Sequence, residues 1–317
     1  ARARKRRMTF FSICRILSLV LAVLPTVEGE ACVMRLLDKS KKPPTLEDVG
    51  FAPQMRSALK RLIARPTGAL LVSGPTGSGK STTLYAALSE INRPDINIIT
   101  VEDPVEYRLP VVNQVQINHK AGLTFALALR TILRSDPDVI MVGEVRDVET
   151  AKMAIESALT GHLVLSTLHT NDAPSVLSRL NEMGVEPFLT GSAVTAVLAQ
   201  RLVRRLCVHC AERYQPREQD LAVARVSKER VEEILGQGLY RAQGCSRCNS
   251  TGYRGRTGIF QLMVMQEDLE RLAAARSSRD ELERAAMAGG METLWNDGLT
   301  KAGAGVTSIE ELHRVLV

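Results

Sequence analysis

The run Gly74–Ser81 contains the residues whose spacing most directly implies chemistry. It reads Gly-Pro-Thr-Gly-Ser-Gly-Lys-Ser and fits a pattern that forms a phosphate-binding loop where a strand leads into a helix. The apolar run 69–73 predicts that strand, and the helical spacing of apolar residues over 82–91 predicts that helix. We therefore predict a nucleoside triphosphate site, with ATP as the expected ligand, formed by Gly74, Pro75, Thr76, Gly77, Ser78, Gly79, Lys80, Ser81 and Thr82.

Each residue type in this loop has its own expected role. The glycines let consecutive backbone N–H groups approach the phosphates closely, which a Cβ atom would obstruct. We expect Lys80 to reach the terminal phosphates and Ser81 to coordinate Mg²⁺. The N-terminus of the following helix adds its positive end to the same site.

A carboxylate for the metal is expected at Glu144, where the apolar run 138–143 ends. In phosphate-loop enzymes a strand near the loop ends in an acid that holds Mg²⁺ or its water shell. Glu144 lies one residue beyond the usual position, with Gly143 between it and the strand. We predict that Glu144 and Ser81 form the magnesium site. The alternative is an ordinary surface acid at the end of a strand.

A second group of acids, Val101–Glu106, also follows a predicted strand. Hydrolysis requires a group that positions or deprotonates the attacking water, and a carboxylate can do this. We assign that role to Glu102, with Asp103 and Glu106 as neighbours that bind metal-bound water or cap a turn. An acid-rich turn before Pro104, with no catalytic role, stays open.

Two histidines, His162 and His169, flank one apolar strand. Together with the nearby Thr167 and Thr170 they could sense the terminal phosphate by hydrogen bonding, and we include both among the catalytic candidates. A single histidine at a strand end more often makes a structural hydrogen bond, so that alternative stays open.

Four cysteines form two Cys-x-x-Cys pairs, at Cys207 and Cys210 and at Cys245 and Cys248. Two such pairs can present four thiolates to one Zn²⁺ in a closed, structural tetrahedron. Two redox pairs or two disulfides are the alternatives, but the sequence around them is not thioredoxin-like. We predict a zinc module, and we assign no role to Cys14 and Cys32.

Composition limits the class of protein. The chain has 317 residues, 45% of them hydrophobic and 24% charged, which is typical of globular proteins of more than one unit. Aromatic residues make up only 4%, which argues against base-stacking platforms for single-stranded nucleic acid. The net charge of +6 comes largely from five basic residues in 2–7, so the rest gives no support for a nucleic-acid partner.

The N-terminal segment predicts no ordinary element. The basic cluster and the apolar stretch 9–24 resemble a secretory signal peptide, but Arg15 interrupts the stretch and no Ala-x-Ala cleavage site follows. We expect instead a truncated or misplaced N-terminal region. Residues 25–38 read as a short extended segment before a linker rich in Lys and Pro.

The order of elements predicts an α/β fold with a mostly parallel sheet covered on both faces, because strands alternate with helices after the phosphate loop. We expect residues 172–205 and 260–317 to be helical. The other predicted helices are 45–65, 124–134 and 149–159, and the other predicted strands are 97–101, 139–142 and 162–167.

Taken together, these segments resemble the type II secretion and type IV pilus assembly ATPases, most closely the branch of general secretory pathway protein E. The cysteines disfavour the retraction ATPases of the same superfamily, which lack them. The matching segments are 74–88, 101–110, 135–147, 160–173, 199–207 and 244–260.

The resemblance implies a RecA-like phosphate-loop core. It also places Lys80 and Ser81 in a Walker A loop, Glu102 in an aspartate box, Glu144 in a Walker B box, and His162 and His169 in a histidine box. It implies a hexameric, cytoplasmic motor, peripheral at the inner membrane through platform proteins, with no nucleic-acid partner. A neutralising arginine is expected but not chosen among Arg130, Arg134, Arg146 and Arg201.

We therefore expect a Mg²⁺-dependent ATPase that drives pseudopilus assembly and protein export. A type IV pilus extension ATPase is the alternative, followed by a nucleic-acid translocase and a non-hydrolysing assembly subunit. The expected divisions are an unassigned segment 1–24, the remnant of an N-terminal domain 25–50, an ATPase core 51–206, a tetracysteine module 207–253 and a helical subdomain 254–317.

Overall fold

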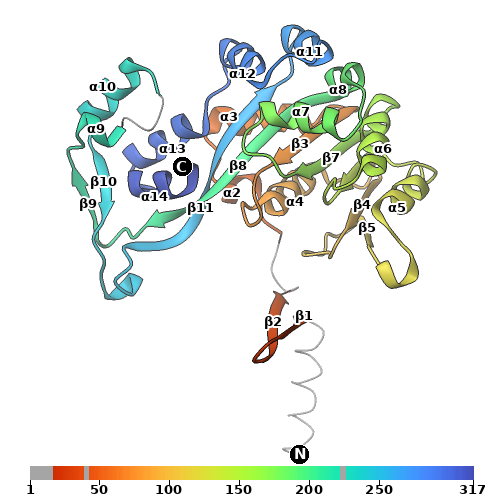
Figure 1. Cartoon of the computed structure of the whole chain (residues 1–317), viewed down its shortest axis with the longest axis horizontal. Coiled ribbons are helices and arrows are strands. Elements are labelled where there is room, and N and C mark those ends of the chain that lie inside the picture. The colour runs from red at the N-terminus through yellow and green to blue at the C-terminus, as the bar shows by residue number, and fades with distance from the viewer. Residues whose placement is uncertain (1–16, 39–42, 222–225) are drawn as a thin grey trace, which may run out of the picture.

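The fold is built on one seven-stranded sheet, in a computed structural model that describes residues 17–38, 43–221 and 226–317. The strand order is β11-β8-β3-β7-β6-β4-β5, and every neighbouring pair is parallel except β11 and β8. The predicted α/β class is confirmed (Figure 1). The strands are β3 (Gly68–Ser73), β4 (Ile98–Glu102), β5 (Asn113–Gln116), β6 (Val139–Val142), β7 (Leu163–Leu168), β8 (Val194–Leu206) and β11 (Tyr253–Val264).

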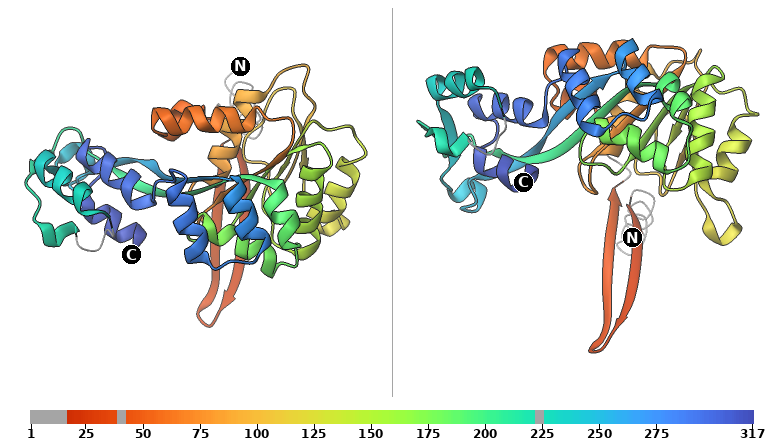
Figure 2. Two further views of the ribbon diagram at one scale, coloured as in Figure 1. Left: turned by 90° about the horizontal axis from the view of Figure 1, so that it is seen from above. Right: turned by 45° about the horizontal axis from the view of Figure 1, so that its top comes forward.

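Helices cover both faces of the sheet, as Figure 2 shows from above. Alternate residues of β3 face opposite sides, so Leu70 and Val72 join one core while Ala69 and Leu71 join the other. The first core includes α2 (Leu46–Val49), α3 (Pro53–Ile63) and α4 (Lys80–Ile91). The second includes α5 (Phe125–Ile132), α6 (Val148–Leu159), α7 (Pro174–Glu182), α8 (Pro187–Ala193), α11 (Glu267–Ala274) and α12 (Arg279–Ala288).

A third core lies at one end of the molecule, where β8 and β11 extend beyond the sheet (Figure 1). Val203 of β8 and Ile259 of β11 are fully buried there among the C-terminal helices. Around this core lie β9 (Ala211–Tyr214), α9 (Glu218–Leu221), α10 (Lys228–Gln237), β10 (Leu239–Ala242), η3 (Ser246–Cys248), α13 (Leu294–Gly303) and α14 (Ile309–Leu316).

Two of the expected helical ranges are partly wrong. Residues 194–205, expected to be helical, lie in β8, and residues 260–264 belong to β11. Both runs are buried along most of their length, and a buried strand lacks the polar–apolar alternation that distinguishes it from a helix. Because β11 completes the sheet, residues beyond 253 contribute to the core that was expected to end at 206.

Smaller departures have local causes. The helix expected over 45–65 is divided into α2 and α3 at Gly50, whose φ of 93° no helix interior adopts. β5 was not predicted because Asn113–Gln116 is a half-exposed edge strand without an apolar run.

An antiparallel hairpin, β1 (Leu17–Thr26) and β2 (Gly29–Asp38), stands apart from the body (Figures 1 and 2). The extended segment predicted over 25–38 is confirmed in β2. The stretch 9–24 that resembles a signal peptide becomes strand from Leu17 onward, and its earlier part lies outside the described residues. In the described ranges no helix is long and apolar enough to cross a membrane.

Candidate active site

The phosphate loop joins the carboxyl end of β3 to the first turn of α4, as its sequence predicts. At Gly74, with φ of 146°, a Cβ atom would lie 2.5 Å from the Gln200 carbonyl oxygen and 2.6 Å from Ser78 Oγ. Only glycine fits so close to the neighbouring strand. The Ser78 hydroxyl is buried and has no hydrogen-bond partner among the residues that the structure describes, which leaves a donor inside the loop. The loop therefore has the shape and the unused donor that a phosphate site requires.

A cavity of about 500 Å³ opens next to this loop, at the carboxyl edge of the sheet. Parallel α/β sheets bind ligands at this edge because the loops that follow several strands meet there. The structure thus brings together most of the predicted site residues. Those that line the cavity are Thr76, Gly77, Ser78, Gly79, Lys80, Ser81, Thr82, Glu102, Glu144 and His169.

Lys80 is nine-tenths buried and turns back onto the loop. Its Nζ atom donates to the carbonyl oxygens of Gly74 at 2.8 Å and Pro75 at 3.2 Å. Burial lowers the pKa of Lys80, and the positive Arg201 adds to this, while Glu144 opposes it. An ammonium group held at this place is available to anionic oxygens in the cavity.

Glu144 faces Lys80 across the cavity and lies in a cationic setting. Its carboxylate pairs with Arg146 at 2.7 Å and with His169 Nε2 at 2.7 Å. Burial alone would raise the pKa of Glu144, but Arg146, His169 and Lys80 together hold it below its usual range. The group is therefore ionised, and with the Ser81 hydroxyl it offers hard oxygen ligands of the kind Mg²⁺ prefers.

Glu102 lies at the end of β4, only 4% exposed. Its Oε1 accepts hydrogen bonds from Thr100 at 2.5 Å and from Gln114 Nε2 at 3.1 Å, and its Oε2 accepts from the Tyr85 hydroxyl. Burial raises the pKa of Glu102, while these three hydrogen bonds oppose the rise. A carboxylate with a raised pKa, in a cavity beside a phosphate loop, suits a general base.

The two histidines do not lie together. His169 lies in the cavity, where Nδ1 is 3.1 Å from the Gly74 carbonyl oxygen and 3.4 Å from Lys80 Nζ. His162 lies at the opposite end of β7, where Nδ1 contacts the Ser157 carbonyl oxygen at 3.0 Å near the end of α6. The expectation that His162 senses a phosphate is not met within this chain, because a strand of six residues separates it from the cavity.

Three residues of the site were not singled out from the sequence. Tyr85 contacts Glu102 from α4, and Arg256 reaches the cavity from β11. Gln200 of β8 supports the loop by donating to the Ser78 carbonyl oxygen at 2.6 Å and accepting from Thr83 Oγ1 at 2.7 Å. Gln200 and Arg256 come from strands that the sequence did not place beside β3, so only the sheet order reveals them.

Among the arginine candidates, Arg146 lines the cavity. Arg201 is buried and donates to the carbonyl oxygens of Gln200 and Asn171. Arg130 lies on the exposed face of α5 and pairs with Glu149. Arg134 is exposed at the end of the same helix region.

The four predicted metal ligands converge at the far end of the molecule. The sulfur atoms of Cys207, Cys210, Cys245 and Cys248 all lie within 4.8 Å of one another, and the cysteines are free. Contacts of 3.7–3.9 Å between them match the roughly 3.8 Å edge of a tetrahedron with Zn–S bonds of about 2.3 Å. The geometry favours one closed metal site over disulfides or redox pairs.

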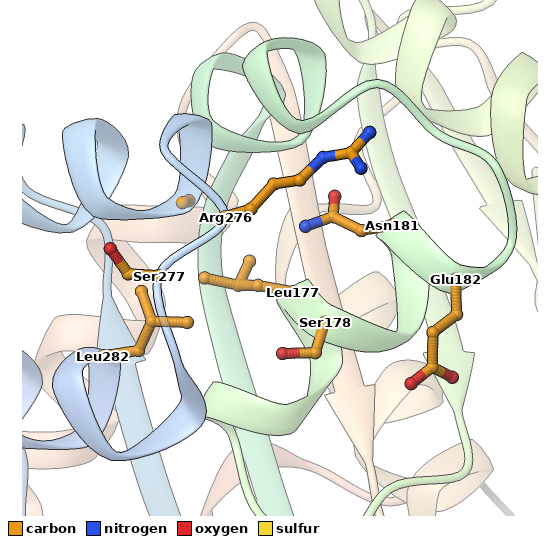
Figure 3. A pocket seen from close by; sticks show the side chains of 8 residues that line it. Leu177, Ser178, Asn181, Glu182, Arg276, Ser277 and Leu282 are labelled. Atoms are coloured by element: carbon orange, nitrogen blue, oxygen red, sulfur yellow. The ribbon is translucent and has the colours of Figure 1, made fainter.

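A second hollow of about 310 Å³ lies between α7 and the segment that joins α11 to α12 (Figure 3). Leu177, Ser178 and Asn181 of α7 face Arg276 and Leu282 across it. It contains none of the predicted site residues and lies in the helical layer, away from the strand ends. The cavity at the phosphate loop is therefore the candidate active site.

A parallel sheet with this loop and two carboxylates at its carboxyl edge defines a phosphate-loop nucleotide-binding protein. A family model described as "Type II/IV secretion system protein" matches residues 5–314. The chain belongs to this family, and the resemblance drawn from its sequence is confirmed.

Similar proteins share about half of the aligned residues. The chain is 50% identical to the type II secretion system protein HxcR of Pseudomonas aeruginosa over 301 residues, 95% of this chain and 60% of that protein. It is 46% identical to the type II secretion system ATPase E of Vibrio cholerae, in an alignment that covers 95% of this chain and 59% of that protein. It is 51% identical to the type IV pilus assembly ATPase PilB of Thermus thermophilus, in an alignment that covers 92% of this chain and 32% of that protein. The chain thus spans one third to three fifths of these relatives.

Solved structures show the same fold. The ATPase DotB of Legionella pneumophila is similar with a TM-score of 0.67 at 21% identity, covering 94% of this chain and 72% of that chain. The pilus retraction motor PilT, solved with bound ADP, is similar with a TM-score of 0.57 at 25% identity. The match covers 93% of this chain and 80% of the PilT chain.

Proposed function

We propose that this chain is the ATP-hydrolysing part of a type II secretion motor. The observation that supports it most is that Lys80, Glu102 and Glu144 come from separate elements and line one cavity beside an intact phosphate loop. Identities of 46–50% to two type II secretion proteins over 95% of the chain direct the proposal to export.

In this mechanism the loop amides and Lys80 bind the phosphates. Ser81 and Glu144 would hold Mg²⁺, which when bound neutralises charge on the phosphate oxygens. Glu102 orients the attacking water and accepts its proton, and Arg146 and Arg256 are placed to offset charge that develops in the transition state.

Hydrolysis would then move the nucleotide-binding core relative to its neighbours and act on platform proteins of the inner membrane. A closed ring of six copies suits this work, since repeated heterologous contacts close into rings. We place the motor in the cytoplasm, on the membrane surface through those partners. The four cysteines would hold Zn²⁺ as a structural ion.

Assembly of a type IV pilus is the second candidate, favoured by 51% identity to PilB over 92% of the chain. The two candidates share the chemistry and differ in the filament that is assembled.

The decisive experiment measures phosphate release from ATP by the purified chain, with Mg²⁺ and with EDTA, together with its mass in solution. We expect metal-dependent release that nucleic acid does not stimulate. Stimulation by DNA or RNA would instead indicate a translocase, and binding of ATP without release would indicate a non-hydrolysing assembly subunit.

A further inference from the structure

The two oxygens of Glu102 are occupied unequally. Oε1 accepts two hydrogen bonds, from Thr100 and Gln114, whereas Oε2 accepts one, from the Tyr85 hydroxyl. A carboxylate has about four acceptor positions, so among the described contacts Oε2 keeps one for a further donor. Because Glu102 lines the cavity, that donor can be a water molecule there.

The Tyr85 hydroxyl has no capacity to spare. It donates to Glu102 and accepts from the backbone N–H groups of Glu106 at 3.1 Å and Tyr107 at 3.3 Å. These two amides occupy both acceptor positions of the phenol oxygen, so its single proton points at the carboxylate. Burial and the negative charge of Glu102 raise the pKa of Tyr85, which keeps the phenol protonated.

Tyr85 also connects three parts of the site. It lies on α4 one turn after Ser81, so both side chains lie on the same face of the helix that follows the phosphate loop. Its hydroxyl reaches the end of β4 at Glu102 and the segment 103–107 that follows. Tyr85 is 1% exposed, and its ring packs edge-to-face against the Tyr107 ring, with 5.1 Å between the ring centroids.

We propose that Tyr85 is a positioning residue for hydrolysis: its hydroxyl fixes the Glu102 carboxylate so that Oε2 accepts the proton of the attacking water. This inference rests on the proposed role of Glu102. Phenylalanine keeps the packing of the ring and removes the hydroxyl, so it isolates what the hydroxyl contributes. Among the described residues, the hydroxyl contacts Glu102 and the backbone of the segment that follows it.

The first test is Tyr85→Phe, with Tyr107→Phe as the matched control that removes a neighbouring phenol and leaves the Tyr85 bonds in place. A general base contributes about 10²- to 10⁴-fold, so we expect loss of its orientation to lower kcat by about 10- to 100-fold. The KM for ATP should stay within about threefold, because no phosphate contact is lost. Tyr107→Phe should retain parental kcat.

The pH dependence separates positioning from packing. The Tyr85 hydrogen bond lowers the pKa of Glu102, so its loss raises that pKa and shifts the acid limb of the kcat profile to higher pH. The same upward shift should appear in the Glu102 resonance of protein labelled with ¹³C at glutamate carboxyls, assigned with Glu102→Gln. This second readout requires no turnover.

If Tyr85→Phe does not fold, 3-fluorotyrosine at position 85 replaces it. This more acidic phenol is a stronger donor, so the Glu102 titration should move to lower pH. An unchanged titration of Glu102 in whichever variant folds, or unchanged kcat in a folded Tyr85→Phe protein, overturns the inference about Tyr85. Full activity of Glu102→Gln would instead overturn the proposed role of Glu102, so the two failures are distinguishable.

Discussion

At the scale of single residues, the charge of Lys80 is held beside the phosphate loop by carbonyl oxygens. Lys80 has no carboxylate within ion-pair distance among the described residues; its Nζ atom contacts carbonyl oxygens and His169. A buried ammonium with neutral partners is stabilised further when phosphate oxygens reach it.

We therefore expect Lys80→Ala to weaken binding of a fluorescent ATP analogue at least tenfold and to abolish phosphate release. Lys60→Ala, which removes an exposed partner of Glu90, is the control. Undiminished hydrolysis by Lys80→Ala would refute the site.

Whereas Lys80 is expected to bind the nucleotide, the negative charge of Glu144 is expected to act in the hydrolysis step that follows binding. Glu144→Gln keeps the shape of the side chain but removes the charge that faces Lys80, Arg146 and His169. We expect nucleotide affinity within about threefold of the parent and hydrolysis lowered by about 10²-fold or more, as for removal of a single electrostatic group. Equilibrium binding and single-turnover phosphate release measure the two effects separately. Normal release would count against a role in metal binding.

Residue types and spacing predicted most of the residues that share the cavity; Gly74, Pro75 and His162 do not line it. Lys80, Ser81, Glu102, Glu144 and His169 all follow the carboxyl ends of parallel strands, and parallel topology alone brings such positions together. His162 was misplaced because it precedes its strand instead of following it. Tyr85 could have been found from its helical spacing to Ser81.

At the scale of elements, the buried carboxylate of Glu311 joins α14 to β8. It accepts from the backbone N–H and the guanidinium of Arg204 and pairs with Arg314. These bonds outweigh burial and hold the pKa of Glu311 at about 2, below its usual value. Its contribution to folding is therefore present above about pH 4.5 and is lost as the pH falls toward 2.

We expect Glu311→Ala to lower the free energy of unfolding by about 1–3 kcal/mol at pH 7, because it leaves the Arg204 amide without its acceptor. The difference from the parent should shrink below about pH 4.5, because the unfolded parent chain then binds a proton at Glu311 that the folded chain takes up only near pH 2. Urea unfolding at pH 7 and pH 3 measures both values, with the exposed Glu310→Ala as the control. An equal difference at both values would contradict the charge argument.

The tetracysteine module is the second element whose stability is testable. The four cysteine sulfurs lie within 4.8 Å of one another, and a Zn²⁺ held by their thiolates would contribute on the order of 10 kcal/mol to folding of the module. We expect about one zinc per chain by elemental analysis, and faster proteolysis of residues 207–253 after chelation. Cys248→Ser should reproduce that effect, whereas Cys32→Ser on the exposed hairpin should not. If elemental analysis finds no zinc and chelation leaves the melting curve of the protein unchanged, the zinc prediction is wrong.

The strands β8 and β11 could not be predicted from the sequence, and the reason is the same for both. β8 and β11 are long, largely buried and paired with each other over ten residues, so their neighbours, and not their own sequence pattern, decide that they are strands. The central strands β3, β6 and β7 were predicted because glycine, proline or charged residues bound each short apolar run.

At the scale of the whole molecule, the cavity is open and cationic groups from distant segments converge on it. Arg146 follows β6 and Arg256 lies on β11 at the edge of the sheet, the strand that extends to the tetracysteine module. Movement of that module relative to the core would therefore displace Arg256 from the nucleotide. If copies of the chain form the proposed ring, such movement would couple the occupancy of one site to the shape of its subunit and to the neighbouring subunits.

Such coupling predicts that subunits do not act independently. If six copies form a closed ring, inactive Lys80→Ala chains mixed with parental chains and allowed to exchange should lower activity faster than in proportion to their fraction. A mixture containing one third of inactive chains should retain well under two thirds of the parental rate, because most rings then contain at least one blocked site. Phosphate release across a mixing series, with light scattering to follow ring formation, measures this directly. A strictly linear decline would mean that each subunit hydrolyses ATP alone, and the arginines of its own chain would then have to complete the site.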